Sequence, residues 1–403
     1  MDLIEEKFAK LGCENAPGQE KLQKAATPDL RGGVLPGTPV DFSHGDVDAH
    51  PPIPGAQEMF NAGYEVGGKQ AYTEYRGGKA TREDLAKKLS AFSGSAVDPD
   101  KNLILTPGTQ GALFLAMGSL VARGDKVAIV EPDYFANRKL VEFFDGELVP
   151  VHLNYENVAD RAGLDLKELE AAFASGVKLF LFSNPNNPTG VIYTADEVRA
   201  IGELAQKYGV FVLADELYSR QIFDGRTYTH LAGLGVLDPD KLLTIIGPSK
   251  TESLSGYRLG VAYGSAPIVT RMEKLQAIVS LRCAGYCQAV FQTWFNEPEG
   301  WMAERIRQHQ TIRDDLSALL RKGGLSVRTT EGGSYLFATA PELEVSMKDF
   351  VKIVRQLAGV TVTPGTEFGP QFTNSFRMNF SQDHKAAVAA VERLIEVMNR
   401  YRK

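Results

Sequence analysis

The chain has 403 residues, a formal net charge of −6, and 43% hydrophobic against 23% charged residues, as is typical of a globular enzyme with a large core. The acidic balance excludes a sequence-wide basic surface for nucleic acid. No apolar run of about eighteen residues occurs, so no membrane span is expected. The cysteines Cys13, Cys283 and Cys287 suit a reducing compartment, and residues 1–12 lack an apolar signal region, so we expect a cytoplasmic protein.

Short apolar runs alternate with longer amphipathic runs in the central part of the sequence. This alternation predicts an α/β fold, in which a mostly parallel sheet is covered by helices. The strand-like runs are apolar throughout, which indicates burial on both faces of the sheet. The expected strands are 102–106, 126–130, 148–153, 178–182, 210–214, 242–246 and 258–262. The helices expected between them are 110–121, 137–144, 166–174 and 195–208.

After about residue 290 the pattern becomes that of a smaller α+β domain. The elements expected there are helices 299–322, 347–357 and 385–400, strands 326–329 and 334–338, and a strand that ends at Arg377. The residues before 45 are rich in glycine and proline and indicate an extended arm. We therefore expect an N-terminal arm and part of the small domain in 1–45, a large domain in 46–290, and a small C-terminal domain in 291–403.

Four stretches put reactive and charged side chains at the ends of expected strands, where α/β sheets hold ligands. They are 183–190 (SNPNNPTG), 215–218 (DELY), Ser249-Lys250 with the nearby Arg258, and Arg377. A lysine can form a Schiff base with an aldehyde, a buried aspartate can pair with a protonated pyridine nitrogen, and an arginine can bind phosphate or carboxylate. Together these stretches predict a pocket for pyridoxal phosphate.

Each stretch taken alone has a simpler explanation. Lys250 would be a surface lysine, because most lysines are exposed. Asp215 would be a solvated cap at the start of a helix. The 183–190 segment would be a tight loop held by Asx turns.

The sequence context favours ligand binding at Asn187, at Tyr218 and at a further segment, 108–110. Asn187 lies between two prolines, so its amide is a rigidly held donor for a phenolic oxygen, and Tyr218 is three residues from Asp215 and can reach the same ring. Gly108, Thr109 and Gln110 lie where an expected strand meets a helix, and free backbone amides at a helix start attract phosphate.

The order of these motifs resembles that of the class I and II aminotransferases, the fold type I pyridoxal-phosphate enzymes related to aspartate aminotransferase. The resemblance extends from about residue 41 to residue 400 and rests on NPNNPTG (184–190), DELY (215–218), SK with GYRLG (249–260), and SFR (375–377). It implies a Schiff base on Lys250, a ring-nitrogen contact from Asp215, ring-oxygen contacts from Asn187 and Tyr218, and substrate-carboxylate binding by Arg377.

The same resemblance implies further roles. It implies that the cofactor phosphate is bound by Gly108, Thr109, Gln110, Ser249 and Arg258. Tyr134 would stack on the cofactor ring, and Gly45 would lie beside the substrate carboxylate. Tyr72 would reach the phosphate of a neighbouring subunit, which implies a homodimer with shared active sites.

Three features depart from the family pattern. Gly247 occupies the position of a serine that often binds the phosphate, and Pro107 precedes the phosphate loop. The loop 44–50 also differs, and in it Asp46, Asp48 and His50 alternate. A metal site there is imaginable, but loops rich in aspartate are usually turns, so no metal is expected.

The expected activity is transfer of the amino group of an L-amino acid to a 2-oxo acid, with the Lys250 amine moving the α-proton. Elimination, decarboxylation or oxidation on the same cofactor needs the same lysine and aspartate and stays an alternative. A regulatory module that had borrowed the fold would carry a DNA-binding domain, and no basic segment precedes these motifs. The donor and acceptor stay open. Arg76 and Arg282 are candidates for a distal carboxylate, or else arginines of the surface or of an interface.

Overall fold

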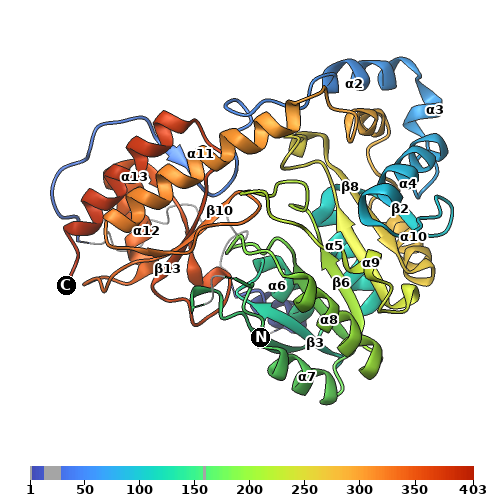
Figure 1. Ribbon diagram of the computed structural model, residues 1–403, viewed down its shortest axis with the longest axis horizontal. Coiled ribbons are helices and arrows are strands. Elements are labelled where there is room, and N and C mark those ends of the chain that lie inside the picture. Colours follow the sequence, from blue (N-terminus) through green and yellow to red (C-terminus); the bar gives the residue numbers. More distant parts are fainter. Residues whose placement is uncertain (1, 13–28, 158–159) are drawn as a thin grey trace.

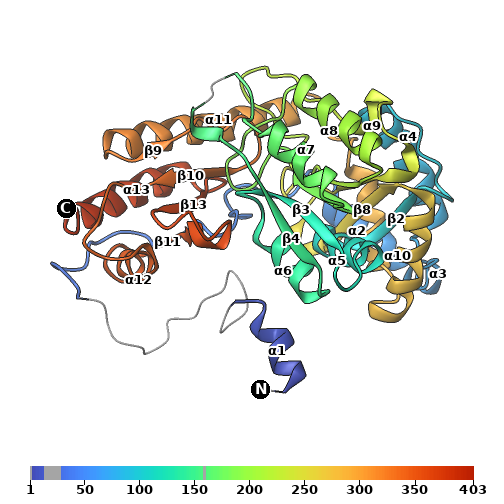
Figure 2. The ribbon, with the colours of Figure 1, turned by 90° about the horizontal axis from the view of Figure 1, so that it is seen from below.

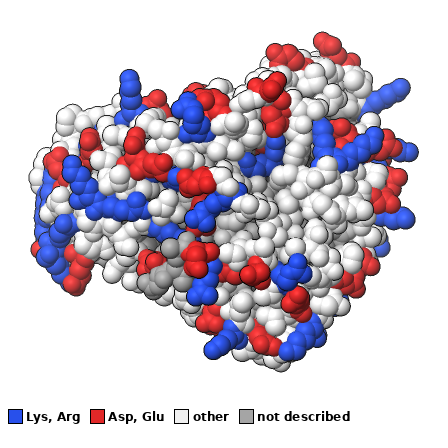
Figure 3. Space-filling view, viewed as in Figure 1, with Lys and Arg blue, Asp and Glu red and all other residues white. Residues whose placement is uncertain are grey.

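The computed structural model describes residues 2–12, 29–157 and 160–403, so Cys13 and part of the expected N-terminal arm lie outside the described residues. The described chain contains three sheets, of seven, four and two strands, and the two larger sheets lie in different halves of the molecule (Figure 1). On the face drawn in Figure 3, basic and acidic side chains are interspersed.

The large sheet has seven strands in the order β2-β8-β7-β6-β5-β3-β4. Strand β8 runs antiparallel to both of its neighbours, whereas the other neighbouring pairs are parallel, so the predicted mostly parallel sheet is confirmed. The strands are β2 (Leu103–Pro107), β3 (Lys126–Glu131), β4 (Glu147–His152), β5 (Leu179–Ser183), β6 (Phe211–Asp215), β7 (Leu242–Ile246) and β8 (Leu259–Gly264).

Strand β5 shows why the central strands are apolar throughout. Phe180 and Phe182 belong to the core on one face of the sheet, and Leu179 and Leu181 belong to the core on the other face. Successive side chains of a strand point to opposite faces, so helices on both sides require a continuous apolar run.

Helices surround this sheet (Figures 1 and 2). Those that follow the predicted positions are α5 (Gly108–Leu120), α6 (Phe135–Phe143), α7 (Leu166–Ala174) and α8 (Ala195–Tyr208). Others were not predicted: α2 (Ala56–Glu65), α3 (Gly68–Ala71), α4 (Lys79–Ser93), α9 (Leu231–Leu234) and α10 (Ala266–Val279). Short 3₁₀ helices are η1 (Tyr155–Asn157), η2 (Pro239–Lys241), η3 (Ser255–Tyr257), η4 (Tyr286–Thr293) and η5 (Gly365–Glu367).

The second sheet has four strands in the order β12-β13-β10-β9 and is antiparallel. Its strands are β9 (Ser326–Val327), β10 (Tyr335–Thr339), β12 (Thr363–Pro364) and β13 (Ser375–Asn379), and the helices α11 (Trp301–Lys322), α12 (Met347–Ala358) and α13 (His384–Asn399) accompany it. The prediction that a strand ends at Arg377 was wrong, because pairing with β10 continues to Asn379 and leaves Arg377 in the middle of β13.

Segments near the N-terminus join both halves of the molecule. Strand β1 (Val40–Asp41) pairs in parallel with β11 (Val360–Thr361), which adds it to the C-terminal half. Helix α1 (Leu3–Ala9) instead lies beside α6, where the rings of Phe8 and Phe143 are 6.1 Å apart (Figure 2). Within the described residues, no helix combines the length and apolar character needed to cross a membrane.

Candidate active site

A cavity of about 590 Å³ opens at the carboxyl ends of β5, β6 and β7. Side chains from three of the four sequence stretches line it, although these stretches lie far apart in the chain. The sequence-predicted residues that line it are Thr109, Gln110, Tyr134, Asn187, Asp215, Tyr218, Ser249, Lys250 and Arg258. Brought together in this way, the residues form one site at the edge where open α/β sheets bind ligands.

Asp215 ends β6, beside its register partner Ser183 at the end of β5. Its Oδ1 accepts a hydrogen bond from Leu217 N at 3.1 Å. Burial raises the pKa of the Asp215 carboxyl to about 6, although the Leu217 hydrogen bond acts in the opposite direction and the neighbouring Glu216 charge adds to the rise. A carboxyl in such surroundings is stabilised in its charged form by a cationic partner, such as a protonated ring nitrogen.

Two lysines line the cavity, and their surroundings differ. Lys139 Nζ donates to the carbonyl oxygen of Leu11 at 2.7 Å and lies 3.6 Å from Glu367 Oε2, so its amine is already engaged. Lys250 lies in the turn after β7, next to the buried Ser249. Of the two amines, that of Lys250 is the better placed to react with an aldehyde inside the cavity.

A close backbone approach forms a cradle at the start of α5. Gly108 has φ +74°, and a Cβ atom there would lie 2.5 Å from Arg258 Nη2. A Cβ on Gly260 would lie 2.2 Å from the carbonyl carbon of Gly108. The first-turn amides of α5 and the Arg258 guanidinium thus meet at one place, an arrangement that fits a phosphate group.

The departure at Gly247 has a steric reason. A Cβ atom at this position would lie 2.9 Å from Thr109 Cγ2 and 3.1 Å from the carbonyl oxygen of Leu259. A serine would therefore displace the start of α5. Ser249, which lines the cavity two residues later, donates its hydroxyl to Leu259 O at 3.3 Å.

A buried carboxyl that the sequence analysis missed ties the ring-facing residues together. Asp133 accepts a hydrogen bond from Tyr134 N at 2.7 Å and a very short one from the Ser183 hydroxyl. Ser183 Oγ in turn accepts a hydrogen bond from Asn187 N at 3.2 Å. Burial raises the pKa of Asp133 to about 8, partly offset by the Ser183 hydrogen bond. Asp133 thus positions Tyr134 and the Asn187 loop relative to each other.

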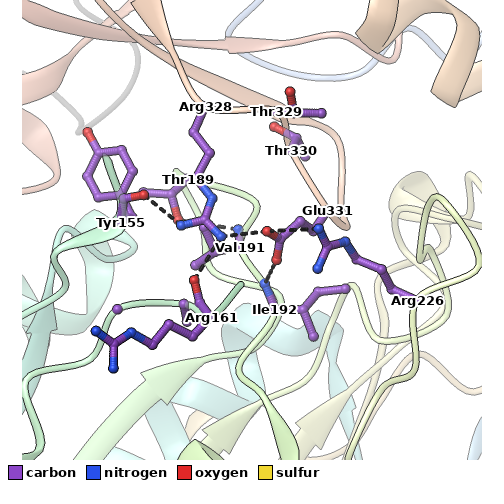
Figure 4. A network of polar contacts seen from close by, with 12 residues as sticks. Tyr155, Arg161, Thr189, Val191, Ile192, Arg226, Arg328, Thr329, Thr330 and Glu331 are labelled. Atoms are coloured by element: carbon purple, nitrogen blue, oxygen red, sulfur yellow. Dashed lines mark hydrogen bonds and ion pairs between the residues drawn. The ribbon is translucent and has the colours of Figure 1, made fainter. Parts of the chain in front are cut away.

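A second anchor holds the far end of the Asn187 loop (Figure 4). Glu331 Oε2 accepts a hydrogen bond from Ile192 N at 2.9 Å, and Glu331 Oε1 accepts one from Arg328 Nη2 at 2.5 Å. Glu331 N donates to Gly190 O at 2.8 Å. The segment that leads into β10 is therefore fixed to the loop that carries Asn187, so the small sheet and the cavity are joined here.

Arg377 is buried beside the cavity and contacts it through Asn187. Its Nη1 donates to Asn187 Oδ1 at 3.0 Å, and its Nη2 donates to Ser43 O at 3.1 Å. Arg377 Nε is buried without a hydrogen-bond partner among the described residues. The guanidinium lies 4.1 Å from the ring centre of Tyr335, which lines the cavity and which sequence reasoning missed.

Gly45 and Tyr72 do not line the cavity. Gly45 lies near Ser381, where an added Cβ atom would meet Ser381 Oγ at 3.4 Å. Tyr72 is 79% exposed on the surface, and the Arg282 guanidinium lies 5.2 Å from its ring centre. Arg76 Nε donates to Glu273 Oε2 at 2.6 Å. Neither Arg76 nor Arg282, the two candidates for a distal carboxylate, lines the cavity of its own chain.

The loop that carries Asp46, Asp48 and His50 is a hydrogen-bonded turn. Asp46 Oδ1 accepts hydrogen bonds from Asp48 N at 2.8 Å and Ala49 N at 3.1 Å. His50 Nε2 lies 3.1 Å from Gln382 O. In the part of the chain that the structure describes, no three His, Cys, Asp or Glu side chains form a metal-binding group.

Comparison with known proteins identifies the family of the chain. The family model for aminotransferase class I and II matches residues 40–394. The chain is 29% identical to an aspartate aminotransferase of Sulfolobus acidocaldarius over 343 residues, which is 83% of this chain and 84% of the relative. It is 25% identical to aromatic-amino-acid aminotransferase 2 of Thermococcus litoralis, over 79% of this chain and 81% of the relative.

A solved structure is more similar still. The crystal structure of an aspartate aminotransferase from Rhodobacter sphaeroides superposes with a TM-score of 0.94 at 58% identity, covering 99% of this chain and 100% of that one. Family model, curated relative and solved structure all match over most of the chain. The chain belongs to the class I and II aminotransferase family.

Proposed function

We propose that this aminotransferase holds pyridoxal phosphate in the cavity and transfers the amino group of an L-amino acid to a 2-oxo acid. The observation that carries this proposal is the convergence of Lys250, Asp215, Asn187 and Arg258 on one cavity. When bound there, the cofactor would supply an aldehyde for amine chemistry and a ring that withdraws electrons. The cradle at Gly108 and the buried carboxyl of Asp215 both fit this group.

Each residue has a role that its surroundings support. Lys250 Nζ supplies the primary amine for the aldehyde and then accepts the α-proton of the substrate. Asp215 holds a proton at the ring nitrogen. Asn187 Oδ1 is occupied by Arg377, so its amide nitrogen, together with the Tyr218 hydroxyl, is the donor for the phenolic oxygen. Backbone and side-chain donors for the phosphate come from Gly108, Thr109, Gln110, Ser249 and Arg258, and Tyr134 stacks on the ring.

Arg377 binds the α-carboxylate of the substrate, near Gly45. A guanidinium presents two parallel donors that match a carboxylate, and burial strengthens such a pair. The Nε that lacks a partner among the described residues is one donor that a carboxylate could use. Aspartate is the first donor to test, because the similar Rhodobacter sphaeroides and Sulfolobus acidocaldarius proteins are named aspartate aminotransferases.

Replacing Arg377 with leucine should raise the apparent KM for amino donors by about 10- to 100-fold, the loss expected for charge-assisted hydrogen bonds. Cofactor absorbance should be retained, because Arg377 does not line the phosphate cradle. Arg377→Lys is the matched control. It keeps the positive charge but loses the two parallel donors of the guanidinium, so its KM should lie between those of the wild type and Arg377→Leu. The measurement is a panel of amino donors with 2-oxoglutarate and with pyruvate. Unchanged constants for every donor would place Arg377 outside the substrate site.

We also propose a homodimer with shared active sites. A surface patch formed by Tyr72, Tyr75, Ile278, Val279 and Leu281 is exposed, with Tyr72 at 79% and Ile278 at 82%. The Arg282 guanidinium lies within 5.5 Å of the ring centres of both tyrosines. Large exposed apolar side chains gathered in this way suit an isologous contact with a second copy, in which Tyr72 reaches the partner's phosphate.

Mixing inactive Lys250→Ala subunits with impaired Tyr72→Ala subunits tests this assembly. If sites are shared and subunits exchange, one site of the mixed dimer carries both substitutions and the other carries neither, so activity returns. The expected recovery is about a quarter of wild-type activity for a random equal mixture. An active, monodisperse monomer by light scattering, without recovery on mixing, would rule the shared site out.

We keep the division into 1–45, 46–290 and 291–403 as a proposal. The pairing of β1 with β11 supports assigning the N-terminal segment partly to the small domain, and the change of sheet after β8 supports a boundary near residue 290. A cytoplasmic location is also a proposal, and the free thiols of Cys283 and Cys287 support it.

A further inference from the structure

A second tyrosine, Tyr335, contacts Tyr218 in the wall of the cavity. The hydroxyl oxygens of Tyr218 and Tyr335 are 2.8 Å apart, and their rings meet edge to face at 5.5 Å. Both side chains are buried and both line the cavity. Tyr335 therefore belongs to the wall of the site, although no motif pointed to it.

The number of protons in this pair limits what each hydroxyl can do. In the structure, Tyr218 donates its one proton to Tyr335. A hydroxyl has one proton to donate and two acceptor positions. If Tyr218 gives that proton to a phenolic oxygen in the cavity, the contact with Tyr335 survives only if Tyr335 becomes the donor.

The other neighbour of Tyr335 allows this reversal. Asn379 is its register partner on β13, and interaction with the Asn379 side chain is one of the effects that lower the pKa of Tyr335. Asn379 Oδ1 accepts a hydrogen bond from Ser381 N at 2.9 Å, and the amide nitrogen is the one atom of this side chain that can donate to Tyr335. Tyr335 would then accept from Asn379 and keep its own proton for Tyr218.

We propose that Tyr335 is a positioning residue of the transamination site: its hydroxyl donates to Tyr218, and its ring face holds the Arg377 guanidinium. The inference rests on the proposed function, because it assigns Tyr218 to the phenolic oxygen of the cofactor. A donor chain from Asn379 through Tyr335 makes Tyr218 a stronger donor, since hydrogen bonds in a chain polarise one another.

The ring of Tyr335 has a second role, which is to pack against the Arg377 guanidinium. Arg377 lies 4.1 Å from the ring centre of Tyr335 and 4.8 Å from that of Phe368. Packing between two aromatic faces aligns the guanidinium fork, and the cation–π contact strengthens when it is desolvated. Hydroxyl and ring can therefore be removed one at a time.

Several charged and titratable groups face the pair. Asp215 lies at the end of β6, Lys250 in the turn after β7, and Arg377 in β13. Tyr134, the residue before α6, also interacts with Tyr335. Substitutions at Tyr335 and Asn379 leave all four of these groups in the chain, so a difference between the variants is attributed to the Tyr335 side chain.

The test is a pH titration of the visible absorbance of the cofactor-loaded enzyme, together with binding of succinate, a carboxylate without an amino group. Tyr335→Phe removes only the hydroxyl. A weaker Tyr218 donor stabilises the ionised phenolic oxygen less, so the pH midpoint should rise by roughly half a unit. The dissociation constant of succinate should stay within about twofold, because the ring that packs on Arg377 remains.

Tyr335→Leu is the matched control for the ring. It should weaken succinate binding by about fivefold or more in addition to raising the midpoint. Asn379→Ala is a second route to the same answer and should raise the midpoint by a smaller amount in the same direction. If Tyr335→Phe does not fold, Asn379→Ala still tests the donor chain.

The outcomes separate this inference from the proposed function. If the pH midpoints of Tyr335→Phe and Asn379→Ala both equal that of the wild type, the donor role of Tyr335 is overturned. Equal succinate binding in Tyr335→Phe and Tyr335→Leu overturns the role of the ring. A wild-type protein that shows no cofactor absorbance at all contradicts the proposed function itself.

Discussion

Replacing Lys250 with alanine is expected to abolish transamination, with a loss of more than about 10⁴-fold in kcat. Lysine supplies both the amine for the aldehyde and the base for the α-proton, so one substitution removes two roles. The purified variant should also lack the pH-sensitive absorbance that depends on the lysine amine. Steady-state assays and a spectrum of the same sample measure the two effects.

The control for this experiment is Lys139→Ala. Lys139 also lines the cavity, but its amine is bound to Leu11 O and lies near Glu367. It should therefore keep the pH-sensitive absorbance. Loss of this absorbance in Lys139→Ala and its retention in Lys250→Ala would show that the reactive amine belongs to Lys139 and not to Lys250.

Replacing Asp215 with alanine should lower kcat by about 10²- to 10³-fold, the effect of losing one preorganised electrostatic group. Without the carboxylate, the ring nitrogen loses the partner that keeps it protonated, and the ring withdraws electrons less well. Rates are to be measured with saturating cofactor, so that weak binding does not imitate slow chemistry. Rates comparable to those of the wild type would contradict the ring-nitrogen role.

The same substitution should cost little stability in the cofactor-free protein. Burial raises the folded-state pKa of Asp215 from 3.8 to about 6. Stability linked to this group is therefore present below the unfolded value and is lost as the pH rises through about 6. At pH 7 the ionised carboxyl opposes folding, so thermal unfolding of Asp215→Ala at this pH should occur no earlier than that of the wild type.

Local sequence signals predicted the ends of several elements. Helix α8 spans Ala195–Tyr208, as expected, because Thr194 and Glu197 form a capping box and Gly209 ends the helix in a left-handed conformation. Helix α10, which was not predicted, has a similar signal at its start: Ser265 Oγ accepts a hydrogen bond from Ile268 N at 3.4 Å, and Pro267 lies in the first turn.

Contacts between distant residues could not be predicted in the same way. Tyr335 lies 117 positions from Tyr218, and Asp133 lies 50 positions from Ser183. In the sequence, Tyr335 is one apolar residue of a strand, and Asp133 is one acidic residue of a turn. Their importance comes from the pairing of β10 with β13 and from the side-by-side ends of β3 and β5, which no short pattern encodes.

The motif residues were predictable because their chemistry is specific, whereas their partners were not. Tyr72 and Gly45 followed from resemblance alone, and neither lines the cavity of its own chain. A tyrosine on a surface patch gives no local sign of the partner that would cover it.

A half-reaction tests the proposed transamination most directly. The wild-type enzyme is mixed with the best amino donor of the panel and no 2-oxo acid, and the keto product and ammonia are measured per active site. We expect a single equivalent of keto product per site, no ammonia, and renewed turnover once 2-oxoglutarate is added. Continuous release of ammonia and keto product without an acceptor would contradict transamination and would identify an eliminating enzyme on the same site.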